Sequence, residues 1–344
     1  LPLSLARGSL ATVAKKDELP DNDLDDVRDD IGAVTAAGHA PVPWRWYEEG
    51  YDKEPVGGAD PVDAGGLHAS YITHHNGPQY FGYVANNPEM REKLRGLGDL
   101  FDDIAGDKLP KTGGVFYVKG GYRNIAGLKP ADPNAQQVFL GDDDHPGYSD
   151  AMISEALVAR AVNAIAKSRY WNESAIIITW DDSEGDYDHV PPPIRAKGPD
   201  GSVISDGPRV PLILISPYAR AGYVAHAQGN QASVVKFADA VFNLPALALL
   251  PDEERGRKLG EKEFGQKGLG PEDAITPGVG NLMEAFSPAR LLGKAPPLPA
   301  SYVEIPDSLV QHLPQETGYG CADLGIVTTD RQLHITNKIP DDFN

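Results

Sequence analysis

Apolar and polar residues alternate in short blocks along this chain, and one block ends more abruptly than the others. Residues 175–178 read Ala-Ile-Ile-Ile, and the adjacent acids Asp181 and Asp182 follow three positions later. Consecutive β-prone residues are typical of a strand buried on both faces, so we predict a central strand here. Asp181 and Asp182 would then leave the sheet at its carboxyl end, where open α/β sheets bind ligands.

The remaining periodic segments predict that helices and strands alternate. Further strands are predicted at 42–47, 115–118 and 207–217, and helices at 31–37, 88–104, 150–168 and 232–242. This order favours an α/β fold with a mostly parallel, doubly wound sheet and helices on both faces. Beyond about residue 250, glycine, proline and charged residues dominate, which predicts one domain over 1–250 and a loop-rich extension over 251–344 that wraps it.

The composition narrows the classes of function. The 344 residues are 41% hydrophobic, which is enough to bury a large core. A formal net charge of -19 argues against binding to nucleic acid or anionic membranes, so an anionic substrate would need a local positive centre such as a metal. No apolar run approaches the roughly 18 residues of a membrane helix, so stable membrane insertion is not expected. Cys321 is the one cysteine, which excludes an internal disulfide and a thiolate zinc cluster.

Asp181 and Asp182 are the candidate metal ligands. Neighbouring carboxylates repel each other, and a divalent cation between them relieves that repulsion. The alternative is an acidic surface turn, because strand-end acids often only cap the next helix. Gly185, His189 and the prolines at 191–193 indicate a shaped loop, which favours the metal site.

Three histidines are candidates for proton transfer or for contact with an oxyanion. His74 and His75 are adjacent on a predicted turn, where each could act on a metal-bound oxyanion or simply bind backbone. His145 follows three acids at 142–144, which should raise its pKa and favour a proton-donating imidazolium. The alternative is that this cluster only starts the next helix, with Ser149 as its N-cap.

Three further side chains leave two interpretations open. Trp44 and Trp46 would share one face of a strand, where they could pack against the sheet or stack on a substrate. Arg209 could bind an anion or form a structural salt bridge.

Five blocks of the sequence occur in an order that resembles one enzyme family. They are a Trp-x-Trp block at 31–46, a His-His-Asn block at 71–81, a His-x-Gly-Tyr block at 145–148, an Asp-Asp-x-x-Gly block at 177–192 and a Gly-Pro-x-x-Pro block at 207–222. Together they resemble the bacterial phosphoesterase family that contains secreted acid phosphatases and phosphatidylcholine-type phospholipases C. That family is a branch of the alkaline-phosphatase-like superfamily.

The resemblance implies a chemistry and roles for the candidate residues. It implies that 1–250 is the C-terminal part of an alkaline-phosphatase-like domain and that the substrate is a phosphoric ester. It also implies that Asp181 and Asp182 bind a divalent metal ion. By the same resemblance, His145 and one of His74 and His75, of which we favour His75, contact or protonate the phosphoryl group. Asp188 and His189 match the family as well, with a role that the motif leaves open.

The chain departs from the family pattern in one respect. Family members carry a Glu-Asn metal-binding pair and a Ser or Thr nucleophile in a Gly-Pro-Thr-like turn before the Trp-x-Trp block, and neither motif occurs here. We therefore expect these groups to lie in an N-terminal region outside this sequence, or in an N-terminal chain of the same precursor. The family is mostly exported, which implies a secreted or periplasmic location.

Three functions remain in view. The first is metal-dependent hydrolysis of soluble phosphoric esters, as in an acid phosphatase, which the acidic charge favours. The second is a phospholipase C-type phosphodiesterase. The third is a noncatalytic processed subunit or binding module.

Overall fold

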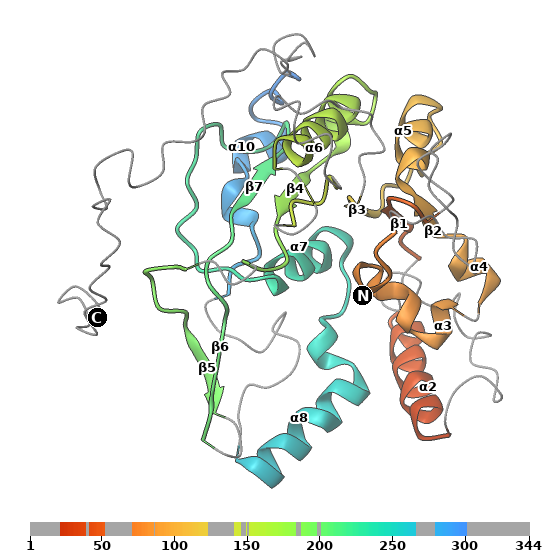
Figure 1. The fold of residues 1–344 in the computed structure, drawn as a ribbon, viewed down its shortest axis with the longest axis vertical. Coiled ribbons are helices and arrows are strands. Elements are labelled where there is room, and N and C mark those ends of the chain that lie inside the picture. Colours follow the sequence, from red (N-terminus) through yellow and green to blue (C-terminus); the bar gives the residue numbers. More distant parts are fainter. Residues whose placement is uncertain are drawn as a thin grey trace, which may run out of the picture.

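The structure of the protein is a computed structural model. It describes residues 21–38, 41–51, 71–85, 87–122, 141–145, 149, 151–183, 187–197, 201–265 and 279–300. Among these residues helices and strands alternate and one sheet is parallel, which agrees with the predicted α/β class (Figure 1). Gly185, Cys321 and most of the predicted extension lie outside the described residues.

A parallel sheet of three strands positions the candidate site. Strand β1 (Trp44–Glu48) lies between β2 (Leu94–Gly96) and β3 (Val115–Lys119), in the order β2-β1-β3. Both pairings are parallel, with Trp46 opposite Leu94 on one side and Tyr117 on the other. The carboxyl ends of the three strands therefore meet at one edge of the sheet.

Most of the predicted helices are present. The α-helices are α2 (Asp21–Ala36), α3 (Gly82–Ala85), α4 (Pro88–Arg91), α5 (Leu97–Ala105), α6 (Ala151–Ala166), α7 (Ala232–Phe242), α8 (Pro251–Phe264) and α10 (Pro288–Leu291). Short 3-10 helices are η2 (Thr73–His75), η3 (Gly77–Tyr80), η5 (Trp171–Glu173), η6 (Leu247–Leu249) and η7 (Met283–Ala285). The predicted single helix at 88–104 is wrong, because residues 94–96 pair with β1 and separate α4 from α5.

The strand before Asp181 also differs from the prediction of a buried central strand. Strand β4 (Ile176–Thr179) pairs antiparallel with β7 (Leu212–Ile215), and its three isoleucines are only partly buried. Parallel partners need a crossover, usually a helix. Between β4 and β7 the described residues instead form a hairpin of β5 (Ile194–Lys197) and β6 (Val203–Ser205), which lies apart from the parallel sheet (Figure 1).

The core is built on both faces of β1. On one face Trp44, which is 2% exposed, packs in a cluster with Met90 and Leu94. Trp46 packs against the same cluster and stacks on Tyr117 with a ring-centroid distance of 4.8 Å. Both tryptophans therefore serve packing, which is one of the two predicted interpretations. On the opposite face, Tyr47 packs with residues of α5 and α6.

A buried carboxylate fastens β1 to α5. Asp103 is 4% exposed and accepts hydrogen bonds from the Tyr47 hydroxyl at 2.7 Å and from Arg45 Nη1 at 2.5 Å. We expect Asp103→Ala to lower the free energy of unfolding by about 3 kcal/mol, because it leaves a guanidinium and a buried hydroxyl without their acceptor. Urea unfolding measures this change.

The matched control is Asp99→Ala on the same helix. Asp99 forms a partly exposed ion pair with Arg95, at 2.8 Å, and such pairs contribute about 0.5 kcal/mol. Equal losses in the two variants would contradict the role of the Asp103 contact.

Candidate functional site

The carboxyl ends of strands from both sheets bring charged side chains together. Lys119 is the last residue of β3, and Asp181 lies two residues beyond the end of β4. Lys119 Nζ lies 3.5 Å from Asp181 Oδ1. The parallel sheet and the antiparallel pair therefore direct their strand ends toward one place.

His75 lies in the same group, on the short helix η2. Burial lowers the pKa of His75 to about 4, and the charge of Lys119 acts in the same direction. The charges of Asp181 and His145 also act on His75, so the structure brings three of the predicted site residues near one another. At neutral pH His75 is an uncharged imidazole, which can accept or donate one proton.

Two side chains lie next to the His75 ring. His75 Nδ1 lies 3.8 Å from Asp143 Oδ2. The ring of His74 meets the His75 ring edge-on, with centroids 4.4 Å apart. His74 itself is exposed, while His75 is half-buried. His75 is thus the more enclosed histidine of the pair.

The acidic segment at 142–144 connects the histidines to the strand end. The backbone N–H of His145 donates to Asp143 Oδ1 at 3.3 Å, and Trp180 Nε1 donates to Asp144 Oδ2 at 2.7 Å. Trp180 directly precedes Asp181, so this bond ties the loop of His145 to the loop of the acids. The hydroxyl of Ser149 donates to the His145 carbonyl at 2.6 Å.

Asp181 and Asp182 are both exposed, and the side chain of Asp181 is 71% exposed. Gln231 Nε2 supports their loop by donating to the carbonyl oxygen of Asp181 at 2.9 Å. Partial burial would raise the pKa of Asp181, but the ammonium of Lys119 lowers it below its usual value. Asp181 is therefore ionised and open to a ligand.

The fit of this site to a metal can be judged from its donors. In the part of the chain that the structure describes, no three His, Cys, Asp or Glu side chains are grouped to hold one metal ion. The ionised oxygen of Asp181 already faces a cation, the ammonium of Lys119, and carboxylate oxygens suit hard divalent cations. Asp181 and Asp182 offer exposed carboxylates of the kind that such cations bind, and the metal site stays a prediction.

Two buried acids at the end of β1 were missed by the sequence analysis. Glu48 and Glu49 are both 0% exposed, and Trp46 Nε1 donates to Glu48 Oε2 at 3.0 Å. Burial raises the pKa of the neighbouring Asp142 to about 6. Adjacent acids at the end of a predicted strand were a usable signal, since Asp181 and Asp182 also follow a predicted strand.

Glu48 should make the stability of this chain depend on pH. Burial raises its pKa from 4.5 to about 8. Between those values the unfolded chain ionises Glu48 while the folded chain keeps it protonated, so the free energy of unfolding falls by about 1.4 kcal/mol per pH unit. The contribution is fully present below pH 4.5 and is lost as the pH rises through about 8.

We therefore expect Glu48→Gln to flatten the fall in stability over this range, because glutamine keeps the shape and cannot ionise. Urea unfolding of both proteins at several pH values measures the difference. Parallel stability curves would show that Glu48 does not titrate in this way.

Arg209 anchors the loop that contains Asp188 and His189. Arg209 donates to Asp188 from Nε and Nη2, each at 2.8 Å, and from its backbone N–H at 3.0 Å. The backbone N–H of Val190 adds a bond of 3.0 Å. These bonds, those from the Arg209 side chain above all, hold the pKa of Asp188 well below its usual range. The salt-bridge interpretation of Arg209 is the one that the structure supports, and the side chain of His189 is 81% exposed.

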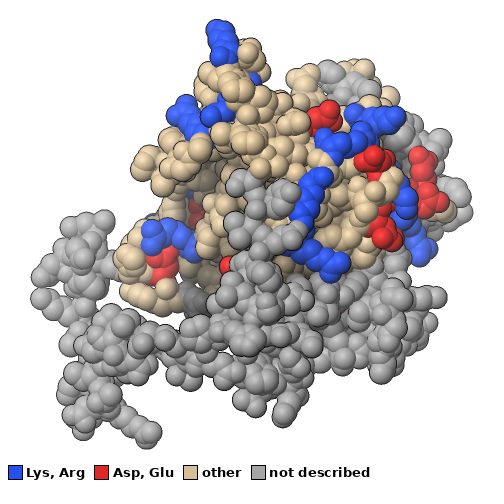
Figure 2. All heavy atoms as spheres, turned by 90° about the horizontal axis from the view of Figure 1, so that it is seen from above, with Lys and Arg blue, Asp and Glu red and all other residues tan. Residues whose placement is uncertain are grey.

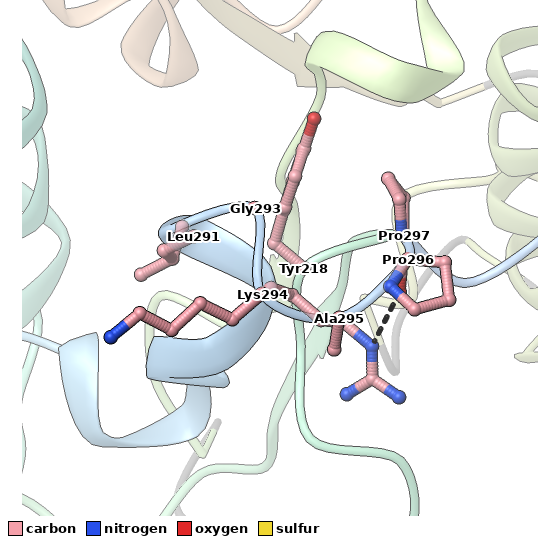
Figure 3. Close-up of a pocket in the computed structure, with 8 residues that line it drawn as sticks. Tyr218, Leu291, Gly293, Lys294, Ala295, Pro296 and Pro297 are labelled. Atoms are coloured by element: carbon pink, nitrogen blue, oxygen red, sulfur yellow. Dashed lines mark hydrogen bonds between the residues drawn. The ribbon is translucent and has the colours of Figure 1, made fainter.

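A hollow of 440 Å³ lies away from this site, between the turn after β7 and helix α10 (Figure 3). Arg290 Nε donates to the carbonyl of Pro296 at 3.2 Å, and the hydroxyl of Tyr218 donates to the carbonyl of Asn172 at 2.9 Å. None of the predicted site residues lines it. In both cases a side chain that lines the hollow donates to a backbone carbonyl oxygen.

Two surface features bear on possible partners. Lysines and arginines lie among the acids on the face shown in Figure 2, so the formal net charge of -19 does not make this face uniformly acidic. Within the described residues, no helix combines the length and the apolar character that spanning a membrane requires.

Comparison with known proteins identifies similar sequences. The Phosphoesterase family profile matches residues 37–245, which is more than half of the chain. Non-specific phospholipase C1 of Arabidopsis thaliana is 33% identical over 125 residues, which cover 31% of this chain and 23% of the relative. Phospholipase C A of Mycobacterium tuberculosis (strain ATCC 25618 / H37Rv) is 25% identical over 166 residues, which cover 43% of this chain and 28% of the relative. The chain spans about a quarter of the length of these relatives.

Proposed function

Because this chain belongs to the Phosphoesterase family, as its sequence blocks predicted, we propose that it carries part of a centre that hydrolyses phosphoric esters. The observation that carries the proposal is the contact of 3.5 Å between Lys119 and Asp181, which joins the strand ends of two sheets beside His75. Acid, base and cation within one group are the components that phosphoryl transfer requires.

In this proposal Asp181 and Asp182 hold a divalent cation. Bound there, the cation would supply positive charge for the phosphoryl oxygens and lower the pKa of an attacking hydroxyl. The nucleophile and the remaining ligands would come from an N-terminal segment or chain, since the family motifs that carry them do not occur in this sequence. The predicted doubly wound, alkaline-phosphatase-like sheet belongs to the same proposal.

The histidines supply proton transfer. His75 is neutral at pH 7 and lies beside Asp143, and its one N–H would orient the phosphoryl group by donating a hydrogen bond to a phosphoryl oxygen. His145, on the adjoining loop, would protonate the leaving oxygen. The hydrogen bond from Trp180 to Asp144 would keep the loop that carries His145 next to the loop that carries Asp181.

A purified polypeptide containing this chain should hydrolyse 4-nitrophenyl phosphate, lose that activity on chelation and regain it when a divalent metal is restored. Full activity after exhaustive chelation would reject the metal-dependent mechanism. Absence of hydrolysis by every polypeptide containing the chain would favour the noncatalytic module.

The second candidate is a phosphodiesterase of the phospholipase C type. The observation that favours it is that the similar proteins are named phospholipases C. One of them is a non-hemolytic phospholipase C of Burkholderia pseudomallei, which is 29% identical over 93 residues. The match covers 21% of this chain and 13% of that protein. Release of phosphocholine from phosphatidylcholine at a higher kcat/KM than hydrolysis of soluble monoesters would support this candidate. The reverse order would support the phosphatase.

We also propose, from the family resemblance, that the protein is exported from the cell. Cell fractionation tests this proposal.

A further inference from the structure

Lys119 is held in place at the end of β3, at the centre of the site. Its carbonyl oxygen accepts a hydrogen bond of 3.3 Å from the backbone N–H of Glu49, which continues the pairing of β3 with β1. The Lys119 side chain is 24% exposed, and its ammonium lies beside Asp181. This position is set by the sheet rather than by a surface loop.

The ammonium of Lys119 has donor capacity beyond its ion pair. An ammonium group carries three N–H donors, and charge-assisted bonds to carboxylates are usually about 2.7–2.9 Å long. The distance of 3.5 Å to Asp181 Oδ1 is therefore a loose contact, and Asp181 is itself largely exposed. The pair leaves Lys119 able to bind a second anion.

Lys119 supplies positive charge at an edge that also carries Asp143 and Asp181. The charge of Lys119 also acts on Glu48 and His75, and burial keeps both of them uncharged at neutral pH. The chain as a whole carries a formal net charge of -19, so a phosphoryl group needs a local cation to approach this edge.

We propose that Lys119 binds a non-bridging phosphoryl oxygen of the substrate, beside His75, and leaves Asp181 to the cation. The inference rests on the proposed function, since it assigns a further substrate-binding residue to the same site. The ligand chemistry is a tetrahedral phosphoryl oxyanion, whether it belongs to a monoester, to a phospholipid headgroup or to the inorganic phosphate that hydrolysis releases.

Inorganic phosphate in the presence of EDTA tests this inference without hydrolysis and without a metal. Isothermal titration calorimetry of this chain should show binding. Lys119→Met should weaken it about tenfold to a hundredfold, because one charge-assisted contact is lost. Lys119→Arg, which keeps the charge, should stay within about threefold of the unmodified chain.

The matched control is Lys258→Met on α8, which removes a lysine from an exposed ion pair with Glu254, 2.7 Å long. This variant should bind phosphate as the unmodified chain does. Far-UV circular dichroism verifies that each variant is folded, and Lys119→Gln replaces Lys119→Met if the latter is not. Phosphate binding that is unchanged by loss of Lys119, or absent from the unmodified chain, would overturn the inference.

Hydrolysis assays separate this inference from the proposed function. In an active polypeptide, Lys119→Met should raise KM for a monoester and for a phosphodiester by about the factor lost in phosphate binding. An unchanged KM for both substrates would reject Lys119 as a substrate contact while hydrolysis itself stands. A third outcome is that Lys119→Met loses phosphate binding while no longer polypeptide containing this chain hydrolyses an ester. That outcome would support the contact between Lys119 and phosphate and would reject the proposed hydrolase activity.

Discussion

Asp181→Asn should lower turnover of a phosphate ester by at least about a hundredfold and remove most of the bound divalent metal. Asparagine keeps the size of the side chain but removes the negative charge that holds the cation. Asp182→Asn should have an effect of the same order, because both carboxylates are exposed at the end of β4 and neither is needed to fill the core. Elemental analysis and initial rates with 4-nitrophenyl phosphate measure both effects.

The control for this prediction is Asp99→Asn, which removes a carboxylate from a partly exposed ion pair on α5. It should leave metal content and turnover unchanged. Full activity and full metal content in both Asp181→Asn and Asp182→Asn would remove these acids from the mechanism.

His145→Gln should lower kcat by about a hundredfold to ten-thousandfold for an ester with a poor leaving group. The reason is that an alkyl alcohol must be protonated as it departs, whereas 4-nitrophenol leaves readily as an anion. The variant should therefore lose much less activity toward 4-nitrophenyl phosphate than toward an alkyl phosphate. Initial rates with the two substrates give the comparison.

His226→Gln is the matched control, because His226 is exposed and lies on a different loop. It should leave both rates unchanged. An equal loss for both leaving groups in His145→Gln would show that His145 positions the site and does not protonate the leaving oxygen.

Several helices and strands could be predicted from the sequence, but the pairing of the strands into sheets could not. The helix at 232–242 and the strand at 115–118 follow from short-range periodicity, and the structure has both. The partner of β4 depends on the connection that follows it, where a hairpin returns the chain antiparallel. Helix α8 was missed because its 14 residues are mostly charged, and it lies against α2, where Arg255 pairs with Asp29 at 2.8 Å.

The candidate site divides in the same way. Adjacent acids after an apolar strand and paired histidines on a turn are local patterns, so Asp181 and His75 could be named from sequence. Lys119 is a single lysine at the end of a strand, which has no distinguishing pattern. Its position opposite Asp181 depends on how two sheets lie relative to each other, and that information is not local.

The central claim is that the acids after β4, the histidines and Lys119 form one phosphoryl-binding centre. A crystal structure of the chain with Mn²⁺ and vanadate tests this claim most directly, because anomalous scattering locates the metal. We expect Mn²⁺ on the carboxylates of Asp181 and Asp182, and a vanadate oxygen within hydrogen-bond distance of Lys119 Nζ, on the side where His75 lies. Mn²⁺ and vanadate bound elsewhere, with these side chains in contact with neither, would contradict it.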